Sequence, residues 1–187
     1  MVYSSSHSMR QRVDAGQFWS RGVISAAGVI ASLAFALPAR AESRRHDGFY
    51  AAANVGVGYV KEVGDDDRGI SLPISLWSGY TFGKVAFGGG LNTNFYIYSV
   101  ALFADIYPDP KGGFHIMPSL GWGLLFPHPR FPSGPVLGGG VGYDFWVGSE
   151  VSMGAMARLT YAPLEDYERD KAYRIYEPAL LYTVTYH

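Results

Sequence analysis

His115 and Ser119 have the residue types that nucleophilic catalysis would need, and they lie close together in the sequence. A serine becomes a nucleophile when a base lies within hydrogen-bonding reach of its hydroxyl. Both residues fall on one face of an expected strand, where a separation of four positions corresponds to roughly 13 Å. Because that distance is too long for a hydrogen bond, the sequence predicts no catalytic pair, and we expect His115 to be structural.

Three charged residues, Asp105, Arg158 and Glu177, fall inside expected strands, on the faces that carry small and polar side chains. Charges in a narrow interior need partners there. Arg158 and Glu177 lie on consecutive strands, so we expect them to form an ion pair that helps to plug the interior. A small proton or ion path is the functional alternative for the same residues.

Asp65, Asp66 and Asp67 are consecutive in an expected loop. Clustered carboxylates bind calcium, but this run lacks the spaced acids and the glycine of a calcium-binding loop. A solvated loop tip is therefore the favoured interpretation. The sequence predicts neither a metal site nor a cofactor.

Two further loops carry groups that suit a surface contact. The segment EDYERDK begins with Glu165 and Asp166, and its mixed charges would meet lipopolysaccharide headgroups. The segment PHPRFPSGP is stiffened by prolines and would present Arg130 and Phe131 to an outside partner or cover the barrel mouth. These loops are the expected interaction sites.

The elements that position these residues are strands, because side-chain character alternates with a period of two from Phe49 to Tyr186 and no helical period appears. Each segment has one large apolar face and one small or polar face. The eight segments run over about residues 49–59, 71–80, 85–95, 99–107, 114–126, 137–145, 151–161 and 177–186. Short turns alternate with longer polar loops, except at residues 95–98, which is typical of a transmembrane β-barrel.

The tightest of the expected turns is PDPKGGF, residues 108–114. Its prolines would stop the preceding strand, and Gly112 and Gly113 are expected to supply the positive φ of the reversal. We interpret this segment as a turn at the periplasmic end, where both ends of the barrel would also lie.

The large face is expected to contact lipid. An eight-stranded barrel has room inside only for side chains, so the glycine-rich face fits the interior and the Leu/Phe/Val/Trp face fits the outside. Aromatic residues concentrate at the strand ends, as they do at membrane interfaces. A soluble lipocalin-like carrier is the alternative, and it would place the large face inside.

Residues 1–41 have the pattern of a cleavable export signal: arginines precede an apolar run from Gly22 to Pro38, and Ala39-Arg40-Ala41 follows. Residues 42–48 would form a short segment before a barrel over residues 49–187.

The chain without this leader has a negative net charge. Four of the 15 basic residues and one of the 16 acidic residues lie in the leader, so the remainder is acidic and unsuited to binding nucleic acid. The chain has no cysteine, which excludes disulfides and thiolate chemistry.

Four segments carry a resemblance: GFYAAANVGVGY, YPDPKGGFH, GGGVGYDFWVGSEVSMGAMARLTYA and LLYTVTYH. Together they resemble small outer-membrane β-barrel proteins of Gram-negative bacteria, related in architecture to OmpX and OmpA-type barrels. The resemblance implies an all-β, eight-stranded antiparallel barrel in the outer membrane, inserted by the barrel assembly machinery. The chain departs from the best-known barrels by ending in His187 rather than in Phe or Trp.

A structural or surface-interaction role, without catalysis, is the function we expect for a monomer surrounded by outer-membrane lipid and lipopolysaccharide. The enzyme alternative is an acyl enzyme that modifies lipid A, which would need a lateral opening lined by prolines. Pro118 and Pro178, both expected on the lipid-facing side, keep that alternative open.

Overall fold

The computed structural model describes residues 48–63, 68–109, 112–126, 131–166 and 171–187 of the chain. The expected leader and Asp65, Asp66 and Asp67 lie outside these residues. The described part is one antiparallel sheet of β1 (Gly48–Glu62), β2 (Arg68–Ser71), β3 (Ile74–Phe82), β4 (Val85–Thr93), β5 (Ile97–Ile106), β6 (Phe114–Leu125), β7 (Ser133–Trp146), β8 (Val151–Asp166) and β9 (Lys171–Tyr186). Within these ranges no helix is long and apolar enough to cross a membrane.

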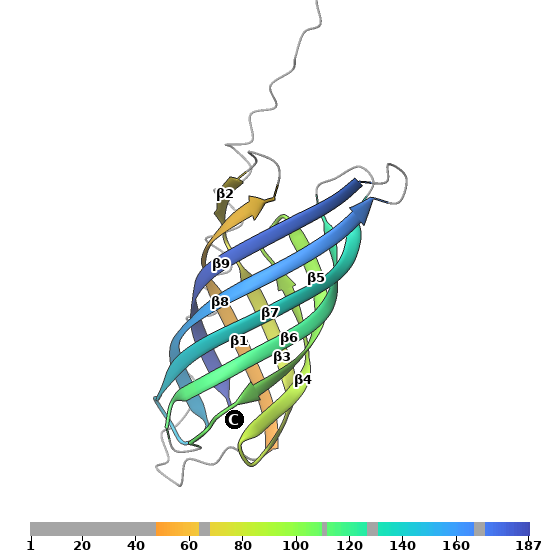
Figure 1. Cartoon of the computed structure of the whole chain (residues 1–187). Helices are drawn as coiled ribbons and strands as arrows, with labels where there is room; N and C mark the ends of the chain where they lie inside the picture. The colour runs from red at the N-terminus through yellow and green to blue at the C-terminus, as the bar shows by residue number, and fades with distance from the viewer. Residues whose placement is uncertain (1–47, 64–67, 110–111, 127–130, 167–170) are drawn as a thin grey trace, which may run out of the picture. The chain divides into compact units, whose positions relative to one another are not determined.

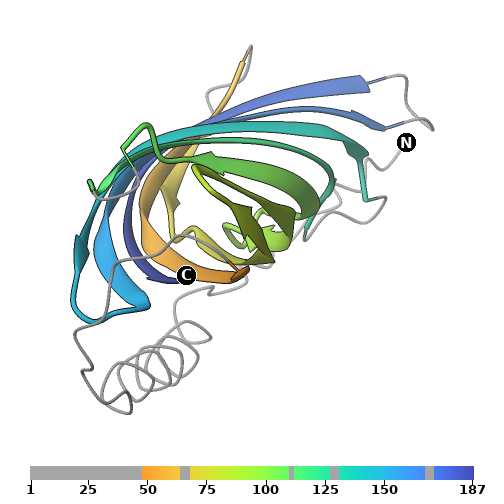
Figure 2. The ribbon, with the colours of Figure 1, turned by 90° about the horizontal axis from the view of Figure 1, so that it is seen from below.

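The sheet closes into a barrel. Strands that follow one another in the chain are neighbours, and β1 also pairs with β9 (Figures 1 and 2). β2 and β3 both pair with β1, and Leu72 and Pro73 separate them, so together they form one barrel strand. The Pro73 carbonyl accepts a hydrogen bond from the Gly56 amide at 3.0 Å, which keeps this break attached to β1. The prediction of eight barrel strands is confirmed.

Prolines coincide with interruptions in the strand pairing because a proline has no amide hydrogen to donate. The β5–β6 pairing is interrupted between Phe103↔Ser119 and Ile106↔Ile116, beside Pro118. The β1–β9 pairing is interrupted beside Pro178, and the β7–β8 pairing where Pro135 and Pro163 occur. Each of these interruptions affects one side of its strand, so the barrel stays closed.

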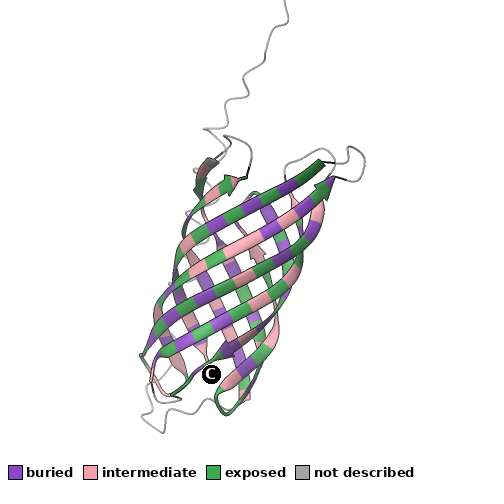
Figure 3. Cartoon of the chain, in the orientation of Figure 1, coloured by how far each residue is buried: buried purple, intermediate pink, exposed green. Residues whose placement is uncertain are grey.

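Burial alternates along every barrel strand (Figure 3). The large apolar face points outward: the exposed side chains include Leu76, Leu91, Leu102, Leu120, Trp122, Val141, Leu159 and Leu180. Tyr50, Asn54, Ser75, Asp105, His115, Asp144 and Thr183 are among those buried inside. The prediction of which face points inward is therefore confirmed, and the lipocalin-like arrangement, with the large face inside, is not the observed one.

Connectors of different length lie at the two ends. The terminal end holds Gly48, His187 and the last residues of β3, β5 and β7, whereas the opposite end, which we call the loop end, holds the last residues of β1, β4, β6 and β8. β8 and β9 extend beyond the other strands at the loop end (Figure 1). The barrel wall is therefore tallest at β8 and β9.

The connector between β4 and β5 is a tight turn at the loop end. The Asn94 side-chain oxygen accepts hydrogen bonds from the amides of Tyr96 at 3.0 Å and Ile97 at 2.7 Å. Phe95 at its centre has a φ of 67°, which is unusual for a bulky residue. The strand therefore ends at Thr93 rather than at residue 95, because the Asn94 side chain replaces the missing strand partner.

The turn between β5 and β6 differs from its prediction. Among the described glycines, only Gly48 and Gly83 have positive φ, so Gly112 and Gly113 do not supply it. Gly113 is needed for another reason: a Cβ there would collide with the backbone carbonyl of Asp144. Its own carbonyl accepts a hydrogen bond from the Asp144 amide at 2.9 Å, which ties this turn to β7.

Gly90 provides a test of packing inside the barrel. A Cβ at this position would collide with the indole of Trp77 and with the Leu76 carbonyl, whereas a Cβ at the outward Gly139 would meet nothing within 4 Å. We expect Gly90→Val to lower the free energy of unfolding by about 1–3 kcal/mol, the usual cost of overpacking. Urea unfolding in lipid vesicles measures this, with Gly139→Val as the control. Equal stability of the two variants would contradict the packing.

Candidate functional site: the polar lumen

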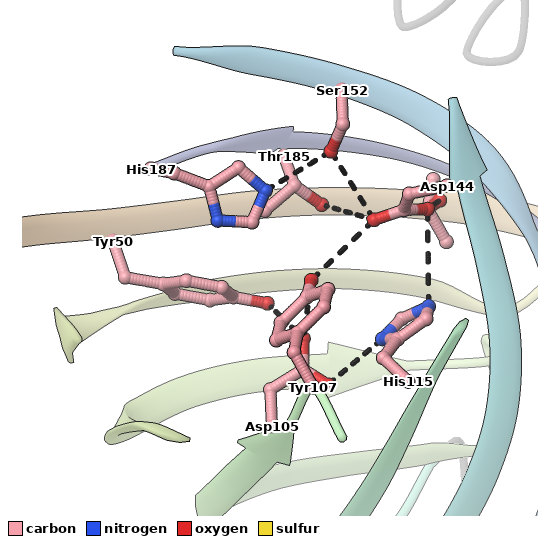
Figure 4. A network of polar contacts seen from close by, with 9 residues as sticks. Tyr50, Asp105, Tyr107, His115, Asp144, Ser152, Thr185 and His187 are labelled. Carbon is pink, nitrogen blue, oxygen red and sulfur yellow. Dashed lines mark hydrogen bonds and ion pairs between the residues drawn. The ribbon is translucent and has the colours of Figure 1, made fainter. Parts of the chain in front are cut away.

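Asp105 is the centre of a buried polar cluster at the terminal end of the lumen (Figure 4). Its carboxylate accepts hydrogen bonds from the hydroxyls of Tyr50 at 2.8 Å and Tyr107 at 3.1 Å. It also lies 2.8 Å from Nδ1 of His115. The Asp105 side chain has no exposed surface and that of His115 is 2% exposed, so the Asp105 carboxylate is satisfied without bulk water, whereas Nε2 of His115 has no hydrogen-bond partner.

Asp144 is the second carboxylate of the cluster. It accepts hydrogen bonds from the hydroxyls of Thr183 at 2.8 Å and Ser152 at 3.2 Å. Nε2 of His115 lies 3.8 Å from the Asp144 carboxylate, so the imidazole stands between Asp105 and Asp144. A buried cation at His115 would face both carboxylates.

Strand ends bring these residues together. Asp105, Asp144 and Thr185 lie at the ends of β5, β7 and β9, while Tyr50, His115 and Ser152 lie at the beginnings of β1, β6 and β8. In an antiparallel barrel with short turns, all six positions fall at one end. Their inward phase then directs them to the same small volume.

Within the cluster, Ser152 and His187 are the two residues that most resemble a nucleophile and its base. The Ser152 Oγ atom lies 3.0 Å from Nε2 of His187. The Ser152 hydroxyl also donates to Asp144, and the residue has no exposed surface. The His187 ring packs against Tyr50, Tyr107 and Trp146. The Ser152 hydroxyl is therefore buried within this packing at the barrel end.

A second polar layer lies further toward the loop end. This layer surrounds a cavity of about 30 Å³, which we call the chamber. The polar residues that line the chamber include Asn92, Ser99, Ser119, Arg158, Thr160 and Glu177. A buried water needs a cavity volume of about 10–15 Å³, so the chamber has room for about two waters. Nε of Arg158 is buried without a protein partner and lies in this lining, where such a water could accept its hydrogen.

Arg158 and Glu177 lie in the chamber without forming the direct ion pair that the sequence predicts. Arg158 donates to the Ser75 hydroxyl at 2.6 Å and contacts the Asn92 side-chain oxygen at 3.5 Å. Glu177 accepts from the Ser71 hydroxyl at 2.6 Å. Each charge is thus held by neutral groups of β2, β3 and β4.

Apolar clusters lie on both sides of the chamber along the barrel axis. Between the chamber and the Asp105 cluster is a layer formed by Tyr50, Ala52, Trp77, Ala86, Ala101, Phe103, Met117, Met156, Ala179 and Leu181. Toward the loop end is a layer formed by Val60, Ile97, Leu125, Val136, Ala162, Leu164, Tyr173 and Ile175. Polar and apolar layers therefore alternate along the described part of the lumen.

Of the remaining predicted site residues, the three that the structure describes lie at the loop end. Phe131 is exposed and stacks on Phe126 at 6.0 Å between ring centroids, and Glu165 is exposed. Asp166, in contrast, is 3% exposed. Arg130 and the aspartates 65–67 lie outside the described residues. Within the described ranges no group of three or more His, Cys, Asp or Glu could hold a metal ion.

Several cluster residues were not singled out from the sequence: Tyr50, Tyr107, Asp144, Ser152, Thr183, Thr185 and His187. The sequence did contain a signal, because each occupies an inward phase next to the terminal end. Grouping inward polar residues by their distance from the nearest short turn would have found them.

The described fold matches solved barrels. Neisserial surface protein A (NspA) aligns with a TM-score of 0.58 and 16% identity over 74% of this chain and 96% of NspA. The fold is that of small outer-membrane barrels. Ail of Yersinia pestis, crystallised with the heparin analogue sucrose octasulfate, aligns at 0.46 and 12% identity, over 75% of this chain and 98% of Ail. OprG of Pseudomonas aeruginosa aligns at 0.42 and 12% identity, over 78% and 100%. No protein-family model and no curated protein matches the sequence.

Asp105→Ala tests the terminal cluster. The substitution leaves two tyrosine hydroxyls and His115 without their shared acceptor in a dry interior. We expect the free energy of unfolding to fall by about 3–5 kcal/mol, measured by urea titration in lipid vesicles. The control is Glu165→Ala, which removes an exposed carboxylate. A loss below about 1 kcal/mol for Asp105→Ala, as for an exposed ion pair, would contradict the role given to this carboxylate.

Proposed function

We propose that this chain is an integral outer-membrane protein whose barrel is a closed support for a loop end that acts at the cell surface, without catalysis. The observation that carries the proposal is an uncharged outward band around the barrel. Charged outward side chains in the described strands are confined to the loop end, at positions such as Lys61, Glu165 and Arg174.

The band has the dimensions of a membrane. It runs from Phe49 to Tyr59 on β1 and from Tyr176 to Tyr186 on β9, which matches the ~9–11 residues that a tilted strand needs. Aromatic pairs mark both edges. At the loop side Tyr161 stacks on Tyr176 at 4.6 Å, and at the terminal side Tyr143 packs against Phe145 at 5.0 Å. Such girdles are typical of membrane interfaces.

The side chains that fill the lumen favour a structural role over a pore. Eight strands leave space only for side chains, and here two apolar layers separate the polar ones. We therefore favour a plugged barrel over the porin-like or ion-path alternative.

The expected leader and the turn pattern set the proposed orientation. A cleaved export signal over residues 1–41 would deliver the chain to the periplasm, where the barrel assembly machinery would insert it. Both barrel termini and the short turns would then face the periplasm. The loop end, with the charges of β8 and β9, would meet the lipopolysaccharide headgroups.

Modification of lipid A remains the enzyme alternative, because Pro118 and Pro178 do lie outward beside interruptions in the pairing. However, the polar groups next to those prolines, Ser119 and Glu177, line the chamber inside the barrel. A change in lipid A mass on deletion of the protein would favour the enzyme.

Membrane fractionation followed by gel migration with and without boiling tests the proposal. A closed barrel stays folded in detergent, so we expect outer-membrane protein whose apparent size shifts on heating. A soluble periplasmic protein with no shift would overturn the proposal.

Leu180→Arg tests the lipid-facing band. Leu180 is 65% exposed in the middle of the outward face of β9, where arginine costs about 2–4 kcal/mol in a bilayer. Ala172→Arg, placed on β9 beyond the aromatic edge, should cost about 0–1 kcal/mol. Unfolding titrations in vesicles compare the two, and similar costs would show that the band does not face lipid.

A further inference from the structure

A groove lies on the outside of the barrel, across β3, β4, β5 and β6. It encloses about 530 Å³, which is within the ~300–1,000 Å³ range of small-molecule sites. The outward side chains in its lining are Ile74, Leu76, Leu91, Thr93, Tyr98, Val100, Trp122 and Leu124. The groove is therefore almost entirely apolar, and it lies in the uncharged band rather than in the lumen.

Strand register builds this groove from two adjacent rows of outward residues. One row is Leu76, Leu91, Val100 and Trp122, and the row nearer the loop end is Ile74, Thr93, Tyr98 and Leu124. Beyond the first row, toward the terminal end, Ser78 pairs with Gly89. A Cβ at Gly89 would meet no atom closer than 3.5 Å. Small residues therefore leave space beneath the two rows on β3 and β4, while Leu102 and Leu120 continue this third row on β5 and β6.

The loop end of the groove has a different character. Tyr98 packs edge-on against Phe126 at 5.6 Å, and Phe126 stacks on Phe131. Phe95 and Phe131 are the only non-glycine residues of the described chain with positive φ, at 67° and 48°. Strained backbone that persists is found preferentially at functional sites. These aromatics and the hydroxyls of Thr93 and Tyr98 give the groove an amphipathic end.

We propose that this groove binds an acyl chain of lipopolysaccharide, with the headgroup at the Tyr98–Phe126–Phe131 end. The inference rests on the proposed function, which places the loop end in the outer leaflet, where lipopolysaccharide is the lipid. The apolar wall of the groove suits the acyl chain, and the aromatic residues at its loop end suit the membrane interface, where the headgroup lies. The groove is also continuous with the lipid-facing band.

A second copy of the chain fits the same groove less well. A stable protein interface buries about 800 Å² on each partner and contains a densely packed core. Eight outward side chains around a hollow offer less than this, whereas a flexible hydrocarbon chain fills a narrow apolar space. Acyl-chain binding is therefore the occupancy that we test.

Val100→Trp would fill the middle of the groove with a side chain that the lipid-facing surface tolerates. Val141→Trp makes the same change on β7, outside the groove, and is the matched control. Native mass spectrometry of protein purified from outer membranes in mild detergent measures the fraction that retains lipopolysaccharide. We expect the fraction that retains lipopolysaccharide to be about tenfold lower for Val100→Trp, because the acyl chain would lose contact for about two of its methylene groups. We expect no change for Val141→Trp.

Leu91→Trp supplies a second groove variant, and heat-shifted migration on gels shows which variants are folded. Equal retention by folded groove variants and the control, retention of phospholipid instead, or dimers without lipid would each overturn the inference. These results differ from a failure of the proposed function, in which the wild-type protein itself would be soluble and would not shift on heating.

Discussion

A closed antiparallel hydrogen-bond network with a narrow interior is the constraint on which the rest of this structure depends. Closure through β1 and β9 pairs the strands on both sides over most of the barrel, so most of the backbone needs no partner from its surroundings. The side chains then divide between two environments. Every second residue enters a lumen too small for bulky side chains from every strand, and the others form an apolar outer surface.

The lumen is filled in layers because buried polar groups must find partners within reach. At the terminal end Asp105 and Asp144 are held by hydroxyls and His115, and in the chamber Arg158 and Glu177 are held by serine and asparagine side chains. Apolar layers separate these networks, which keeps each one small. The lumen is therefore filled by its own side chains, and the exposed side chains lie on the outer wall and at the loop end.

Much of this fold can be predicted from sequence because a period of two is a local property. The inward phase of Asp105, Arg158 and Glu177 and the outward phase of Leu180 follow from alternation alone. Other features depend on contacts between distant segments. Tyr50 and Asp105 are 55 positions apart, so their hydrogen bond depends on register. Gly113 is constrained by the Asp144 carbonyl on β7, and Arg158 is bound by Ser75 rather than by Glu177. The Asn94 turn was missed because Asn94 continues the alternation of β4.

In this structure outward positions of the strands meet lipid, while inward positions meet a packed lumen. Because the chain has no cysteine, single cysteines at positions 179–184 of β9 can be spin-labelled in lipid vesicles. Their accessibility to oxygen, which dissolves in lipid, is then compared with that to a water-soluble nickel complex. We predict high oxygen accessibility at 180, 182 and 184 and low accessibility to both reagents at 181 and 183. A reversed phase, or nickel access at 181 and 183, would contradict this prediction.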